Sequence, residues 1–147
     1  MKKYSKLLLF VAISAVMVIG FASCGNSKTI AVEQGWDLLG EQTVNFVRDR
    51  DEIRVYNQTL YTAVKFQMLN KDVNLNNVAI VYPNGDKLNP SVNEDVPAGS
   101  FSKEIELDIL GKQISAVEFS YRSKGNILKG RARVLVFGKR AIMRQQY

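Results

Sequence analysis

Hydrophobic and polar residues alternate with a period of two through most of the chain from Trp36 onward. Successive side chains of a β-strand point to opposite faces, so this alternation predicts strands that bury one face. The segment 61–69, YTAVKFQML, is the clearest example. Its apolar and polar positions separate onto two faces: Val64, Phe66 and Met68 on one, Lys65 and Gln67 on the other.

The alternation predicts about eight short strands with turn residues between them. They are 36–40, 43–47, 52–56, 61–69, 76–82, 101–110, 115–123 and 131–138. The segment 86–100, rich in Pro, Asn, Ser and acidic residues, is predicted to be an irregular loop. No amphipathic helical stripe of three turns is found after the N-terminal run. The pattern therefore favours an all-β fold, an antiparallel β-sandwich, with a small β-barrel as the alternative.

The strand predicted at 101–110 separates apolar from acidic positions. We expect it to bury Phe101, Ile105 and Leu107 and to expose Glu104, Glu106 and Asp108. Lys103 falls on the buried side, which suggests a sheet edge where a lysine discourages further pairing.

A tight turn is predicted at Lys124-Gly125-Asn126-Ile127, because glycine at the first central position is typical of a type II′ hairpin. The turn predicts that 115–123 and 131–138 pair with each other, in a register where paired residue numbers sum to 251. Apolar pairs then share the core side: Val117 with Val134, Phe119 with Ala132, Tyr121 with Gly130. The outer side carries the polar pairs: Glu118 with Arg133, Ser120 with Arg131, Arg122 with Lys129.

The outer side of this hairpin is the candidate binding surface, because five basic residues gather there: Arg122, Lys124, Lys129, Arg131 and Arg133. Directly opposed like charges cost stability in a sheet, and an anionic partner would give a reason for them. Lipid phosphate, lipopolysaccharide, an acidic protein or an acidic glycan would fit. The alternative is a solvated face whose side chains splay apart or pair with acidic residues from 104–108.

The N-terminus carries a different pattern, in which three lysines precede an uncharged run over 7–21. A basic region followed by about 15 apolar residues predicts a secretory signal peptide, since a membrane span needs roughly 20. Phe21-Ala22-Ser23-Cys24 resembles the bacterial lipobox, whose cysteine is acylated and becomes the new N-terminus. An ordinary signal peptide cut nearby, or a retained anchor helix, are the alternatives.

This interpretation divides the chain into a lipoprotein signal peptide (1–23), a lipidated cysteine with a tether (24–35) and one β-sandwich domain (36–147). Gly25 follows Cys24, and no acidic run comes after it. The sorting signals for inner-membrane retention and for surface export are therefore both missing. We expect a lipoprotein that faces the periplasm, on the outer membrane.

The amino-acid composition excludes several kinds of partner and catalytic site. Three of the 20 Lys and Arg lie in the signal, so 17 remain against 14 acidic residues, a charge of +3 that does not indicate a nucleic-acid partner. With no histidine and one cysteine, the chain lacks the residues for imidazole or thiolate metal sites, for Ser-His-Asp or Cys-His catalysis, and for an internal disulfide. No cofactor is expected.

Several acidic and aromatic residues are further candidates. Asp49, Asp51 and Glu52 could bind calcium, although the interleaved arginines favour a salt-bridged turn. Glu104 and Glu106 form a carboxylate pair, the minimum for glycoside hydrolysis, but on an open surface. Four loop carboxylates could also bind a metal, but solvation explains them more simply: Asp72, Asp86, Glu94 and Asp95. Five aromatic residues could form a sugar-binding platform, but packing explains them more simply: Trp36, Tyr56, Tyr61, Tyr82 and Tyr121.

Five short motifs together resemble a family of small bacterial envelope proteins classed as a domain of unknown function: Trp36-Asp37-Leu38-Leu39-Gly40, Asp49-Arg50-Asp51, Asn84-Gly85, Tyr121-Arg122-Ser123 and Arg131-Ala132-Arg133-Val134. The resemblance covers roughly 36–138. It implies a compact β domain and export, and it supplies no site residues. We therefore expect a non-catalytic binding or accessory module anchored by lipid to the envelope. The alternative is a small carboxylate-based hydrolase of envelope glycans.

Overall fold

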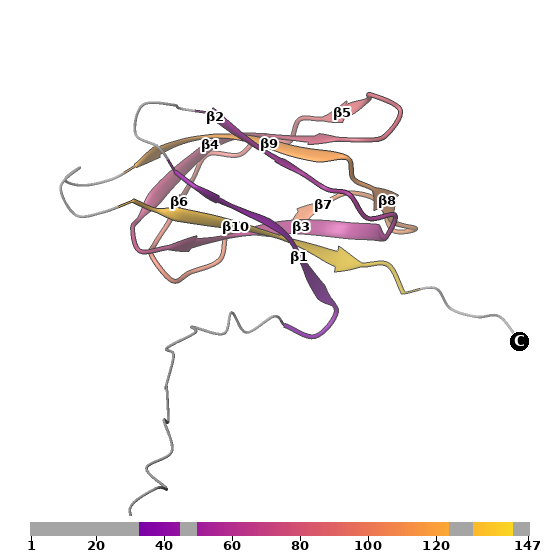
Figure 1. Cartoon of the computed structure of the whole chain (residues 1–147), viewed down its shortest axis with the longest axis horizontal. Helices are drawn as coiled ribbons and strands as arrows, with labels where there is room; N and C mark the ends of the chain where they lie inside the picture. The colour runs from indigo at the N-terminus through magenta and orange to yellow at the C-terminus, as the bar shows by residue number, and fades with distance from the viewer. Residues whose placement is uncertain (1–32, 45–49, 124–130, 143–147) are drawn as a thin grey trace, which may run out of the picture. The chain divides into compact units, whose positions relative to one another are not determined.

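The computed structural model describes residues 33–44, 50–123 and 131–142, which contain ten strands in two antiparallel sheets (Figure 1). Sheet A has the order β1 (Trp36–Thr43), β10 (Arg133–Arg140), β3 (Leu60–Leu69) and β7 (Ile105–Glu106), with β8 (Lys112–Gln113) also paired to β3. Sheet B has the order β2 (Arg50–Arg54), β9 (Ala116–Ser123), β4 (Val73–Val81) and β5 (Lys87–Leu88), with β6 (Glu94–Val96) also paired to β4.

The two sheets form separate layers, so the predicted β-sandwich is confirmed and the barrel alternative is not found in the described part of the chain. Figure 1 shows β2, β9 and β4 in one layer and β1, β10 and β3 in the other. No helix among the described residues is long and apolar enough to span a bilayer.

The core lies between the inward faces of the two sheets. The prediction for β3 is confirmed, since Val64, Phe66 and Met68 are all fully buried. Phe66 of sheet A meets Phe119 of sheet B edge to face, with ring centroids 5.6 Å apart. Such aromatic contacts add to the apolar burial that stabilises a sandwich.

The predicted hairpin between the last two long strands is wrong. β9 pairs with β2 and β4, whereas β10 pairs with β1 and β3, so the two strands lie in different sheets. The predicted faces are nevertheless right, because Val117, Phe119 and Val134 are buried. The period of two determines which side chains face the core, but not which strand lies alongside. The predicted turn falls outside the described residues.

Three other strand predictions need correction. The segments 36–40 and 43–47 were expected as two strands, but β1 runs unbroken from Trp36 to Thr43, with a register shift between Leu38 and Gly40. Residues 45–47 are outside the described residues. The expected loop at 86–100 contains β5 and β6, which both pair with β4.

The segment 101–110 is mostly irregular, with only β7 inside it and an isolated bridge from Phe101 to Gln67. Ile105 is buried as predicted and Leu107 packs against the core, but Phe101 is 41% exposed and Lys103 is exposed. Two hydrogen bonds between Ser102 and Phe66 explain why Phe101 and Lys103 do not follow the predicted alternation. Ser102 donates to the carbonyl of Phe66 at 2.8 Å, and its hydroxyl accepts from the Phe66 amide at 2.9 Å, so a side chain occupies part of the ladder.

Gly138 of β10 is required by packing. A Cβ atom at this position would lie 2.6 Å from Cδ1 of Tyr61, whose ring is fully buried. The Tyr61 hydroxyl donates to Asp37 Oδ2 at 3.3 Å and accepts from Asn57 Nδ2 at 2.9 Å. Burial raises the pKa of Tyr61 above its ordinary value. Tyr61 is therefore a structural residue and not part of an exposed sugar platform.

Candidate functional site

The structure does not bring the predicted basic residues onto one hairpin. Arg122 lies on β9 of sheet B, and Arg133 lies on β10 of sheet A, where it forms an ion pair with Glu41. Arg131 is exposed just before β10. Lys124 and Lys129 lie outside the described residues. The geometric argument for one continuous basic face is therefore lost, although each residue remains a candidate contact by itself.

The outer face of sheet A holds a lysine that the alternation placed among solvated residues. Lys65 is only 6% exposed, and its Nζ lies 4.0 Å from the ring centroid of Trp36 and 4.4 Å from that of Phe101. Glu33 completes the arrangement through an ion pair of 2.5 Å to Nζ. We call these four residues the lysine cage. Cation–π contacts and a carboxylate compensate the charge for its burial.

The lysine cage belongs to a small apolar layer outside sheet A. Leu135 and Phe137 point away from the main core, yet both are essentially inaccessible. Phe101 meets Phe137 edge to face, with centroids 5.7 Å apart. Trp36 is 4% exposed, so it has no free ring face for a sugar. This side of the sandwich is used for packing.

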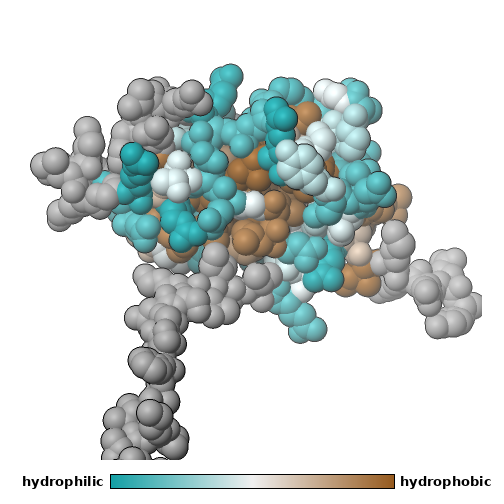
Figure 2. Space-filling view, viewed as in Figure 1, coloured by the Kyte–Doolittle hydropathy of each residue, from teal (hydrophilic) through white to brown (hydrophobic). Residues whose placement is uncertain are grey.

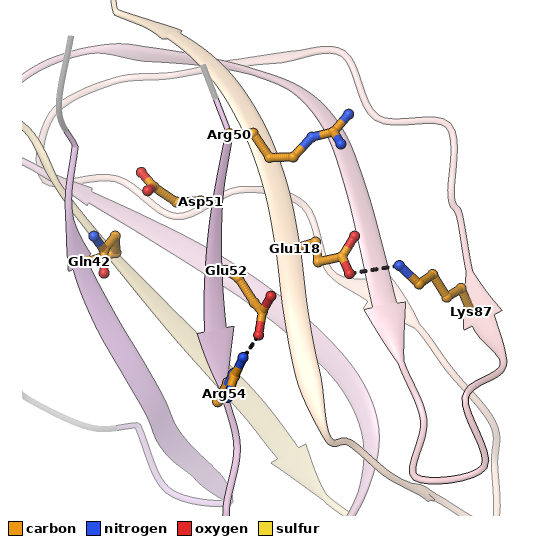
Figure 3. A pocket seen from close by; sticks show the side chains of 7 residues that line it. All are labelled: Gln42, Arg50, Asp51, Glu52, Arg54, Lys87 and Glu118. Atoms are coloured by element: carbon orange, nitrogen blue, oxygen red, sulfur yellow. Dashed lines mark hydrogen bonds and ion pairs between the residues drawn. The ribbon is translucent and has the colours of Figure 1, made fainter. Parts of the chain in front are cut away.

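A hollow with a volume of about 690 Å³ lies at the β2 edge of sheet B and extends over the outer face of this sheet (Figure 3). We call it the charged groove. Its lining consists almost wholly of charged side chains from β2, β5 and β9: Arg50, Asp51, Glu52, Arg54, Lys87 and Glu118, together with Gln42 of β1. Three of these residues are basic and three are acidic. The lining is therefore close to neutral overall but strongly polar.

Two acidic residues of the charged groove lie opposite each other, and each forms an ion pair with a different basic residue. Glu52 of β2 stands directly opposite Glu118 of β9, an arrangement that is unfavourable by itself. Arg54 Nε binds Glu52 at 2.8 Å, and Lys87 Nζ binds Glu118 at 2.7 Å. The hydrogen bond and charge of Glu52 raise the pKa of Arg54 above its ordinary value. The groove therefore presents two fixed ion pairs side by side, with Arg50 above them in Figure 3.

A second hollow of about 340 Å³ continues the charged groove and shares Arg50 and Glu118 with it. Its other polar lining residues are Asn77, Asn89 and Ser120. The amide of Asn77 donates to the Ser120 hydroxyl at 2.9 Å. Arg122 follows Ser120 on the same side of β9. The outer face of sheet B is therefore a continuous polar surface of charges, amides and hydroxyls.

The expected calcium candidates do not converge. Asp51 points to the opposite side of β2 from Glu52 (Figure 3), and it accepts a 2.6 Å hydrogen bond from the Tyr121 hydroxyl. Asp49 is outside the described residues. In the ranges that the structure describes, no three His, Cys, Asp or Glu residues are grouped so that they could hold a metal ion.

The carboxylate pair of the hydrolase alternative lines a separate hollow of about 370 Å³, together with Glu94. Two of these three carboxylates already have partners. Glu94 accepts from the backbone N–H of Lys103 at 3.1 and 3.2 Å, and Glu104 binds Lys139 at 3.1 Å. Both Glu104 and Glu106 are exposed, which is not the desolvated setting that raises the pKa of a general acid.

Comparison with known proteins gives one match. A family model described as a domain of unknown function, DUF2541, matches residues 9–138. No curated protein and no solved structure matches the chain. The matched range includes Cys24 and the whole described sandwich up to Gly138.

Proposed function

We propose that this chain, which belongs to the DUF2541 family of domains of unknown function, is held at the cell envelope by lipid on Cys24 and uses its β-sandwich as a non-catalytic binding or accessory module. It faces the periplasm from the outer membrane in this proposal. The contact surface is the charged groove with its extension to Arg122.

The N-terminal sequence supports the anchor. Three lysines, an uncharged run over 7–21 and the sequence Phe21-Ala22-Ser23-Cys24 follow the order of a lipoprotein signal. Each buried CH₂ of an acyl chain contributes about 0.8 kcal/mol, so two or more chains hold a protein on a membrane almost permanently. The family match begins at residue 9 and therefore extends over most of this segment.

The opposed pair Glu52 and Glu118 is the observation that supports the contact surface. Folding alone gives no reason to place two glutamates opposite each other and then bind one to Arg54 and the other to Lys87. A partner that carries both charges would complement this row. Because basic and acidic residues are balanced in the groove, we favour another envelope protein over an anionic lipid or glycan.

A crosslinking pull-down from intact cells tests the contact surface. We expect Arg50→Glu combined with Lys87→Glu to reduce recovery of envelope partners about tenfold or more, since reversing charges in a complementary interface costs well over 1.4 kcal/mol. A separate variant, Arg131→Glu with Arg133→Glu, reverses two charges outside the groove lining and tests those two predicted contact residues independently. Equal recovery with the groove variant and with wild type would exclude the charged groove as the contact.

Metabolic labelling with a fatty acid tests the anchor separately. We expect the wild-type chain to incorporate the label and Cys24→Ala to lose it completely, because the chain has no other thiol. Globomycin, which blocks lipoprotein signal cleavage, should cause the precursor to accumulate. An unlabelled wild-type chain would refute lipidation, whatever the pull-down shows.

A further inference from the structure

Three large aliphatic side chains are almost fully solvated at one end of the sandwich. Ile109 is 92% exposed, Leu110 is 80% exposed and Ile142 is 90% exposed. We call these three residues the apolar tip. Figure 2 shows hydrophobic atoms at the surface where the C-terminal segment leaves β10.

The two segments that carry the apolar tip lie side by side. A Cβ atom at Gly111 would lie 2.7 Å from Cβ of Ala141 and 3.0 Å from Cβ of Leu60. The amide of Ala141 donates to the carbonyl of Leu60 at 2.9 Å, which fixes the chain directly before Ile142. Ile109 and Leu110 immediately precede Gly111, so all three residues belong to one local surface.

The turn that presents Ile109 and Leu110 is well ordered by hydrogen bonds. Leu110 N donates to Asp108 Oδ1 at 2.8 Å, and Gly111 N donates to the Asp108 carbonyl at 2.9 Å. Gly111 adopts a φ of +83°, which glycine tolerates without strain. The turn therefore holds two aliphatic side chains in water. Polar residues would serve such a turn better, so a contact outside the domain is the natural explanation.

The start of β1 lies at this same end of the sandwich. Arg140 N donates to the carbonyl of Gly35 at 2.9 Å, so the residue before β1 lies beside the last residue of β10. Only nine residue steps separate Cys24 from Glu33, which limits the distance between them to about 32 Å even in a fully extended chain. A lipid on Cys24 would therefore hold Glu33 within about 32 Å of the bilayer surface, which is close enough for the apolar tip to reach the lipid.

Basic side chains lie beside the apolar tip. Lys112 directly follows Gly111 and is exposed. Arg140 is two residues from Ile142, and 56% of its side chain is exposed although it forms an ion pair with Asp37 at 2.9 Å. Apolar side chains next to lysine and arginine suit a membrane interface, where the aliphatic groups enter the acyl boundary and the cations meet phosphates.

We propose that the apolar tip inserts into the lipid interface and orients the sandwich end-on to the membrane. This inference rests on the proposed lipid anchor. The lipid surface is the occupant, because the covalent path from Cys24 reaches this end and basic residues flank it. The described sandwich then stands away from the bilayer, with the β3–β4 end farthest from it.

A single-site fluorophore tests this orientation. Because acylation consumes the only native thiol, Leu110→Cys provides one free cysteine for an environment-sensitive label. The matched control is Ala98→Cys, an exposed site beside Gly99, which bonds to Met68 at the other end of β3. Both lipidated proteins are extracted and reconstituted in phosphatidylethanolamine–phosphatidylglycerol vesicles. Mass spectrometry first verifies the acylated N-terminus, so that failure of the anchor is recognised independently.

We expect the label at position 110 to shift its emission to the blue and to be quenched by brominated lipids, while the label at 98 stays in water. Ile142→Cys should behave like Leu110→Cys. An acylated protein whose label at 110 is neither shifted nor quenched would overturn the inference. So would a shift that depends on protein concentration and not on lipid, because that result would indicate a second copy of the chain as the occupant.

Discussion

The outer faces of the two sheets differ although both belong to antiparallel sheets of five strands. Outside sheet A, Leu135 and Phe137 are buried, and Lys65 lies between the rings of the lysine cage. Outside sheet B, the corresponding positions carry the charged groove and a row of amides. One outer face therefore contributes to folding, while the other carries solvated polar and charged side chains.

The difference is already visible in two strands. β9 alternates, AVEFSYRS, whereas β10 contains the unbroken apolar run Val134–Phe137, all of it buried. Alternation is typical of a strand with one solvated face, and a continuous apolar run is typical of a strand covered on both faces. Short segments beside a sandwich sheet, here those that carry Glu33 and Phe101, can therefore cover its outer face as a third layer.

The largest expected effect comes from removing the packing outside sheet A. Phe137→Ala should destabilise the domain by about 3–5 kcal/mol, because it leaves a cavity beside Phe101. Ser120→Ala, on the outer face of sheet B, should cost no more than about 1 kcal/mol. Urea unfolding of both variants measures the difference. Similar losses in the two variants would contradict the asymmetry between the faces.

A lysine on each outer face gives the second test. Lys65→Ala should cost about 2 kcal/mol through lost cation–π contacts, its ion pair and the gap left between two rings. Lys87→Ala should cost less than about 1 kcal/mol, because its ion pair with Glu118 is exposed. Trp36, the only tryptophan, reports the site directly. Its emission should move to the red in Lys65→Ala and stay unchanged in Lys87→Ala.

The smallest effect is expected inside the charged groove. Glu118→Gln removes the repulsion from Glu52 and the attraction to Lys87, two contributions of similar size and opposite sign. The free energy of unfolding should therefore change by no more than about 0.5 kcal/mol. A loss above about 1 kcal/mol in chemical denaturation would show that the groove stabilises the fold, which would weaken its assignment to binding.

Much of the fold could be predicted from the sequence, because a period of two separates buried from exposed positions. Val64, Phe66 and Val117 were placed on the correct faces for this reason. The pairing of β9 with β2 and β4, and of β10 with β1 and β3, was not predictable in this way. Alternation contains no information about the neighbouring strand, and a plausible local turn supplied the wrong one.

The charged groove was only partly within reach of the sequence. Arg50, Glu52 and Arg54 share one parity, so their common face was visible in RDEIR. Lys87 was hidden, because it lay in a segment taken for an irregular loop, and it meets Glu118 only after β5 pairs with β4. The lysine cage could not be predicted from the sequence either. Its partners come from 33, 36 and 101, which approach Lys65 only in the folded sandwich.

The antiparallel pairing of β1 with β10 has a mechanical consequence. A pull on Gly35 first loads its hydrogen bond with Arg140 and then the pair Trp36 and Lys139, the first of seven residue pairs along β1. Tension along the strand loads this whole ladder in shear, and its hydrogen bonds share the force. Tension across the sheet peels the same bonds apart one after another. A tethered domain with this geometry would withstand lateral drag in one direction far better than in the other.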